Sequence, residues 1–151
     1  MKFSSKCLYG VQALFDLAFH AEAGAAQVKD ICGRQAIPPR FLEQVFQDLR
    51  RAGLVTSKRG PRGGYRLATA PDQLRLGDIL RALEGTLELL PPARSPELLE
   101  SSSHRVAEET FKALSSSIEA CLDAVTIGEM CRKAEAMGIA RRPAPAYVYA
   151  I

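Results

Sequence analysis

The chain has 151 residues, 47% of them hydrophobic and 25% charged, and its formal net charge is +3. This length predicts one compact domain with a proper core and at most one appended element. No apolar run approaches the length of a membrane span, and the N-terminus lacks an apolar signal-peptide core, so the sequence argues against a membrane protein and predicts a cytoplasmic location.

Two helices are predicted within the first 35 residues. The first is capped by Ser4 or Ser5, runs to about Ala23 and is ended by Gly24. Its apolar stripe consists of Leu8, Val11, Phe15, Ala18 and Phe19. The second covers residues 27–35, and its inward residues are Val28, Ile31 and Cys32. Because only residues 36–37 separate it from the next helix, this pattern is typical of a helix-turn-helix.

The third predicted helix begins at Pro38, a residue type suited to a first turn, and closes at Gly53. Four apolar residues at helical spacing face the core: Leu42, Val45, Phe46 and Leu49. The opposite face carries side chains that hydrogen-bond to base edges and phosphates, namely Arg40, Glu43, Gln44, Gln47 and Arg51. We predict that this helix, with Phe41 near its start, enters a groove of DNA.

A β-hairpin follows, with LVTS and YRL as its strands and the turn-forming KRGPRGG between them. No acidic residue lies between Asp48 and Asp72. Residues 1–84 hold 13 Lys and Arg against 8 Asp and Glu, whereas residues 85–151 hold 7 against 9. We therefore expect the basic hairpin residues to lie along the DNA backbone: Lys58, Arg59 and Arg62. A merely solvated basic face is the alternative, and the coincidence with a hairpin motif disfavours it.

The C-terminal half is predicted to be helical around one loop. A fourth helix is marked by Leu76, Ile79, Leu80 and Leu83, with Gly85 beyond its end. Residues 86–103 read as a loop, and a long helix then runs from about His104 to Ala124. Its heptad-like apolar seam is formed by Ala107, Phe111, Leu114, Ile118, Cys121 and Val125. A capping box at Thr126 and Glu129 opens a last helix that closes near Gly138.

These elements predict a mainly α-helical fold with a small β-hairpin wing, that is, a winged helix-turn-helix followed by a long C-terminal dimerisation helix. The winged DNA-binding domain covers residues 1–85 and the loop residues 86–103. The dimerisation helices cover residues 104–138 and a tail residues 139–151. We expect a homodimer whose contacts come from the seam residues Phe111, Leu114, Ile118, Cys121 and Val125.

Five segments carry a resemblance to a known family: KFSSKCLYGVQALFDLA, FLEQVFQDLRRAGLV, RGPRGGYRL, LGDILRALEG and LDAVTIGEM. Over roughly residues 1–137 the chain resembles the Rrf-two family of bacterial winged helix-turn-helix transcriptional regulators. The resemblance implies a homodimeric transcription factor with a long dimerisation helix. It also implies that Arg59, which matches the wing arginine of the family, enters the minor groove.

The resemblance raises the question of a cofactor. Family members that sense iron, nitric oxide or redox state carry an iron–sulfur cluster, whose usual ligands are three cysteines in the loop before the dimerisation helix. Here residues 86–103 contain no cysteine. Because such clusters are held mainly by thiolates, we expect no cluster, no other cofactor and no bound metal.

The four cysteines are Cys7, Cys32, Cys121 and Cys131, and no two of them form a C-x-x-C pair. In a reducing compartment we expect free thiols rather than disulfides. Cys7 and Cys32 are the candidates for a redox role, Cys7 because the dipole of a first helical turn favours a thiolate. The competing interpretation, which we favour for both, is burial as a small apolar side chain.

The sequence thus predicts a sequence-specific, DNA-binding transcriptional regulator. We expect a dimeric repressor that binds an inverted-repeat operator in double-stranded DNA and responds to a metabolite, redox or protein signal that the sequence does not identify. The alternative is a protein-interaction regulator of a metabolic enzyme that has lost DNA binding. An enzyme is disfavoured, because GPRGG leads into a strand rather than a helix and no nucleophile–base pair or metal-ligand spacing is found.

Overall fold

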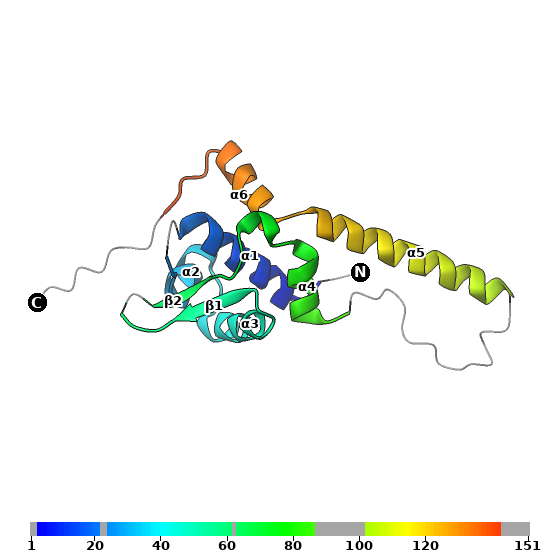
Figure 1. Cartoon of the computed structure of the whole chain (residues 1–151), viewed down its shortest axis with the longest axis horizontal. Coiled ribbons are helices and arrows are strands. Elements are labelled where there is room, and N and C mark those ends of the chain that lie inside the picture. Colours follow the sequence, from blue (N-terminus) through cyan, green and yellow to red (C-terminus); the bar gives the residue numbers. More distant parts are fainter. Residues whose placement is uncertain (1–2, 22–23, 62, 87–101, 143–151) are drawn as a thin grey trace, which may run out of the picture.

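The computed structural model describes residues 3–21, 24–61, 63–86 and 102–142. Three helices come first, α1 (Ser5–His20), α2 (Val28–Gln35) and α3 (Pro39–Arg51). The strands β1 (Val55–Lys58) and β2 (Gly64–Leu67) then pair antiparallel, with Val55 opposite Leu67 and Lys58 opposite Gly64. After a short 3₁₀ turn, η1 (Pro71–Gln73), come α4 (Leu76–Glu84), α5 (Ser102–Ala124) and α6 (Ile127–Ala136). Figure 1 shows the predicted architecture, a mainly helical body with one hairpin.

Helix α1 lies at the centre of this body and packs against α2, α3, α4 and α6. Its buried side chains are Cys7, Ala13, Leu14, Asp16, Leu17, Phe19 and His20. The predicted stripe is therefore wrong in part, since Leu8 is 56% exposed, and Val11, Phe15 and Ala18 are only partly buried. A helix surrounded on several sides has no single inward face, so its apolar spacing does not identify the core positions.

Helix ends follow local capping chemistry. Ser4 caps α1 by accepting a hydrogen bond from the Cys7 amide, but the helix ends at His20, earlier than the predicted Ala23. At the end of α3, Gly53 has a φ of +75°, and the Leu54 amide donates to the Leu49 carbonyl. The helix therefore closes at Gly53, as predicted, and the observed hydrogen bond makes this end one of the Schellman type.

The capping box of α6 is confirmed: the Glu129 amide donates to Thr126 Oγ1, and the Thr126 amide donates to Glu129 Oε2.

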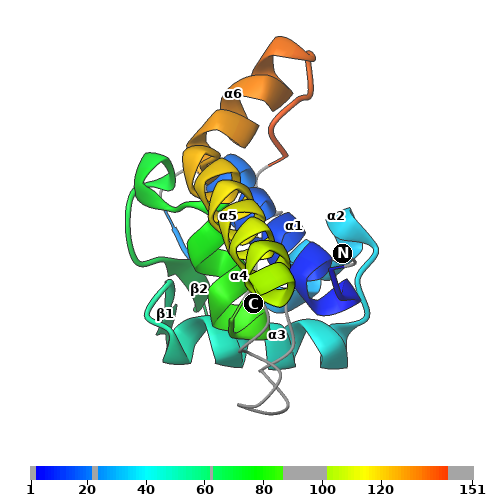
Figure 2. The ribbon, with the colours of Figure 1, turned by 90° about the vertical axis from the view of Figure 1, so that its right-hand side faces the viewer.

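Helix α5 extends away from the body as an arm of 23 residues (Figure 1), which corresponds to about 34 Å of helix. Its C-terminal part is fixed to α4, because Arg81 Nη2 lies 2.6 Å from Asp123 Oδ1. The Leu76 amide also donates to the Val125 carbonyl. Viewed along α5, α3 and α6 lie on opposite sides of the molecule (Figure 2).

The predicted loop and tail fall largely on residues 87–101 and 143–151, outside the described residues. Within the part of the chain that the structure describes, no helix is both long and apolar enough to cross a bilayer.

Candidate nucleic-acid interface

Helix α3 has two clearly different faces. Leu42, Val45, Phe46 and Leu49 are all fully buried, as predicted. The α3 side chains predicted to contact DNA are all exposed: Arg40, Phe41, Glu43, Gln44, Gln47 and Arg51. Pro39 occupies the first helical turn, where its missing N–H leaves no hydrogen bond unmade. The helix therefore anchors one face in the core and presents donors and acceptors on the other.

The hairpin is attached to both ends of the helix-turn-helix. The Tyr65 ring stacks on Phe46 of α3, with ring centroids 4.4 Å apart. Tyr65 and Ala26, the latter just before α2, exchange two backbone hydrogen bonds of 2.9 Å. These contacts fix the position of the hairpin relative to α3.

Two adjacent glycines make this attachment sterically feasible. A Cβ on Gly63 would lie 2.3 Å from the Lys58 carbonyl oxygen, and a Cβ on Gly64 would lie 2.2 Å from the Ala26 carbonyl oxygen. Gly64 also has a φ of +143°, a conformation that side chains with a Cβ rarely adopt. The Gly-Gly-Tyr sequence is thus required by backbone contacts and not merely by turn propensity.

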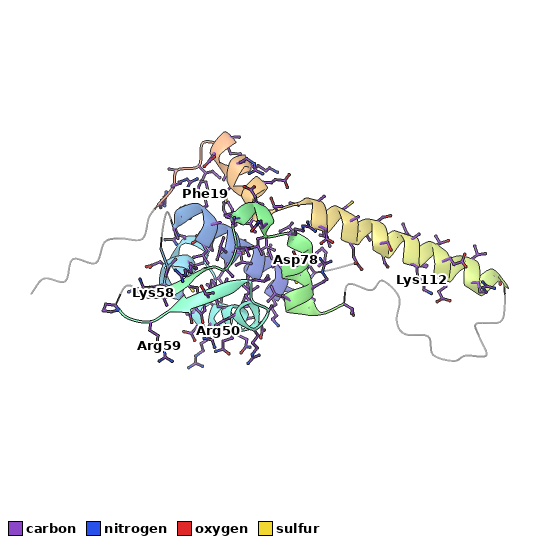
Figure 3. All side chains as sticks on the ribbon, in the orientation of Figure 1. Phe19, Arg50, Lys58, Arg59, Asp78 and Lys112 are labelled. Carbon is purple, nitrogen blue, oxygen red and sulfur yellow. The ribbon has the colours of Figure 1, made fainter. Side chains whose placement is uncertain are left out.

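Cationic side chains gather on the same side of the molecule as α3. Figure 3 shows Arg59 extending from the hairpin and Arg50 lying on α3 below the body. Lys58 and Arg59 are exposed. Among the described residues, no salt bridge involves Arg40, Arg50, Lys58 or Arg59. Arg62, the remaining predicted contact, lies outside the described residues. These unpaired charges are available to a polyanion.

One acidic side chain, which the sequence did not single out, lies at the edge of this surface. Asp48 of α3 forms an ion pair with Lys6 of α1 at 2.7 Å and a second one with Arg51 at 3.2 Å. The hydrogen bond from Lys6 holds the pKa of the Asp48 carboxyl below its usual value. Asp48 therefore binds two cations that would otherwise be free to meet phosphate.

Helix α2 is locked to α1 by a buried carboxylate. Asp16 is 0% exposed, and the guanidinium of Arg34 donates to both of its oxygens, the shortest contact being 2.6 Å from Nη2. Gln35 Nε2 donates to Oδ2 at 3.0 Å. The fork-shaped pairing fixes direction as well as distance, so it sets the angle of α2 against α1.

The cysteines suggested as redox candidates are poorly suited to that role. Cys7 is buried and donates to Glu84 Oε1 at 3.3 Å. Burial, followed by this carboxylate, raises the pKa of the Cys7 thiol to about 12, so the helix dipole does not produce a thiolate. Burial also raises the pKa of the Cys32 thiol. Both observations favour the packing interpretation over the redox one.

The apolar seam of α5 faces solvent in the single chain. Phe111 is 44% exposed and Leu114 is 48% exposed, and Cys121 and Val125 are also exposed. Ile118 is half-buried. Large apolar side chains repeating along one side of a projecting helix are characteristic of a surface that another helix covers.

Comparison with known proteins identifies the family. A family model described as an iron-dependent transcriptional regulator, Rrf2, matches residues 3–133. The chain belongs to the Rrf2 family.

An Rrf2-type relative, the transcriptional regulator IscR of Aliivibrio salmonicida, is 38% identical over 130 residues, which is 86% of this chain and 77% of that protein. The structure of CymR, the global cysteine regulator of B. subtilis, superposes with a TM-score of 0.74 at 31% identity, covering 88% of this chain and 98% of that one. IscR of T. potens gives a TM-score of 0.74 at 39% identity, covering 94% of each chain. The chain is thus a DNA-binding, winged helix-turn-helix transcriptional regulator, and its relatives are regulators rather than enzymes.

The residues of this chain do not fit the iron–sulfur group that the family resemblance raises. Residues 86–103 contain no cysteine. In the described part of the chain, no three His, Cys, Asp or Glu side chains gather in a way that could hold a metal ion. Cys7 and Cys32 are buried in the core, and neither lies in such a group of side chains.

Proposed function

We propose that the chain is a homodimeric repressor that binds an imperfect inverted repeat in double-stranded DNA and is controlled by a signal not yet identified. The main support for DNA binding is the exposed polar face of α3, which lies beside the unpaired cations of the hairpin (Figure 3). Helix α3 enters a major groove, and the hairpin lies along the adjacent backbone, with Arg59 reaching the minor groove.

The dimer is supported by the seam of α5. A two-fold dimer would place two copies of α3 on one side of the DNA, and its symmetry must be mirrored by the operator. Half-sites are therefore expected one or two helical turns apart. DNase footprinting on DNA selected from a random library tests this geometry, and protection of a single asymmetric half-site by one subunit would contradict it. Run-off transcription from a promoter overlapping the footprint tests repression.

Arg59→Ala is expected to weaken binding to operator and random DNA alike. Contacts of a hairpin arginine with phosphates and a narrow groove depend mainly on charge, so the slope of log affinity against log salt should fall by about one. Fluorescence anisotropy over a series of salt concentrations measures this slope.

Glu43→Ala provides the contrast. A glutamate repels phosphates but accepts a hydrogen bond from cytosine, so its loss should leave overall affinity similar or higher while reducing discrimination at one base pair by about 1–3 kcal/mol. If Glu43→Ala retained the discrimination of the parent chain against every single-base operator variant, the specificity role of Glu43 would be wrong.

Asp48→Asn is expected to raise affinity for random DNA. The substitution releases Lys6 and Arg51 from their ion pairs and removes a negative charge at the edge of the interface. The salt slope should steepen by about one for each cation that gains a phosphate contact. The same anisotropy titration with a random duplex measures the change.

Asp72→Asn is the matched control. It also removes an ion pair, of 2.6 Å with Arg132 of α6, and α6 lies on the opposite side of the molecule from α3 (Figure 2). Equal effects of the two substitutions on DNA affinity would show that Asp48 has no special place at the interface.

A further inference from the structure

Phe41 is an apolar side chain on an otherwise polar surface. It is the third residue of α3 and is 38% exposed, whereas the four core residues of the same helix are fully buried. Arg40 and Gln44, its neighbours along the helix, are exposed polar residues. An exposed aromatic ring at this position does not stabilise the core to the extent that a buried one does.

The ring of Phe41 is nevertheless held in a defined position. Tyr9 of α1 meets it edge to face, with ring centroids 5.2 Å apart and planes at 88°. This is a favourable aromatic geometry. Seven residues further along α3, Lys6 of α1 pairs with Asp48, so α1 contacts the same flank of α3 at two points. Together these contacts fix the flank of α3 and, with it, the direction in which the Phe41 ring is exposed.

The chemistry of the ring selects its partner. Phenylalanine has neither donor nor acceptor, so it cannot read the hydrogen-bonding pattern of a base edge. The major groove offers one apolar feature, the C5-methyl group of thymine, and packing a ring against this methyl removes apolar surface of both from water. The first residues of a recognition helix are those that reach base edges.

We propose that Phe41 determines specificity by packing against the C5-methyl group of a thymine in the major groove, and that Tyr9 acts as the positioning residue that holds the ring there. This inference rests on the proposed function, since it requires α3 to enter the major groove. The inference specifies which base the protein recognises, a thymine, and the contact through which it does so, apolar packing against the methyl group.

Uracil substitution tests the contact directly, because uracil keeps every hydrogen-bonding group of thymine and lacks only the methyl. The full-length chain is used to select duplexes from a random library. Each thymine of the selected duplex is then replaced by uracil, one position at a time, and affinities are measured by anisotropy. Each half-site should contain one thymine whose replacement by uracil lowers affinity about fourfold. When this thymine is replaced in both half-sites of the same duplex, affinity should fall on the order of 15-fold.

Variants assign this effect to Phe41. In Phe41→Ala, the thymine and uracil duplexes should bind equally well. Tyr9→Ala should reduce the difference between them, and Tyr9→Phe, which keeps the ring, should preserve it. Met137→Ala removes another exposed apolar side chain, at the C-terminal end of α6, which lies opposite α3 (Figure 2), and should retain the full difference. Circular dichroism checks that each variant is folded.

The outcomes separate this inference from the function on which it rests. A uracil effect that disappears in Phe41→Ala supports the inference. Selected DNA with no thymine in its half-sites, no uracil effect, or an effect that persists in Phe41→Ala would overturn it while leaving DNA binding intact. With any of these three results, the exposed ring of Phe41 would instead serve to contact another protein or only to pack on Tyr9. A chain that enriches no sequence would overturn the proposed function, and the inference with it.

Discussion

Asp16→Ala should lower the free energy of unfolding by about 3–5 kcal/mol, as expected when one partner of a buried ion pair is removed. The carboxylate is fully buried and satisfies the Arg34 guanidinium through both oxygens, with Gln35 as a third donor. After its removal, the side chain of Arg34, itself only 15% exposed, keeps its charge but loses the carboxylate that accepts its hydrogen bonds. The loss is therefore larger than the stabilisation that the pair provides when intact.

Urea denaturation followed by circular dichroism measures this change. Asp78→Ala is the matched control. Asp78 also pairs with an arginine, Arg81, at 3.0 Å, but the Asp78 side chain is 45% exposed. Exposed pairs contribute about 0–1 kcal/mol, so this variant should unfold near the midpoint of the parent chain. Similar midpoints for the two variants would show that the Asp16 pair is not a structural lock.

Asp16 also shows where sequence-based reasoning ends. Its partner Arg34 is 18 residues away on another helix, and the local sequence around either residue does not predict that the two form an ion pair. The same holds for Lys6 and Asp48, which only the packing of α1 on α3 brings together. Leu8 illustrates the converse error. It matches a helical stripe, but the neighbours of α1 bury the adjacent positions instead.

Features encoded within a few residues were predictable. The four core residues of α3 repeat at helical spacing, and the capping box of α6 needs only Thr126 and Glu129. The hairpin was visible from its turn residues, but the reason for two glycines was not. Gly64 must lack a side chain because the Ala26 carbonyl, 38 residues earlier in the chain, lies against it. Local signals therefore place the elements of the interface, and long-range contacts decide how they are held.

Ile118→Glu should convert the proposed dimer into monomers and lower operator affinity by about 10²–10⁴-fold, because two half-sites bound through one linked dimer gain from effective concentration. Ile118 lies in the seam of α5, and a carboxylate buried between two helices carries a desolvation cost of several kcal/mol. Leu114→Glu, at an exposed seam position, tests the same surface without disturbing the monomer core. Ser116→Glu introduces the same charge on the opposite side of α5 and should leave the dimer intact.

Molecular mass from light scattering, measured beside binding to a full operator and to a single half-site, distinguishes dimer loss from misfolding. A folded monomer keeps its winged domain, so the seam variants should bind the isolated half-site as the parent chain does while losing affinity for the full repeat. A variant that lost both would report a damaged fold. An unchanged mass for both Ile118→Glu and Leu114→Glu would show that the seam is not the dimer interface. The inverted-repeat operator would then lose its structural basis, because no symmetry in the protein would require it.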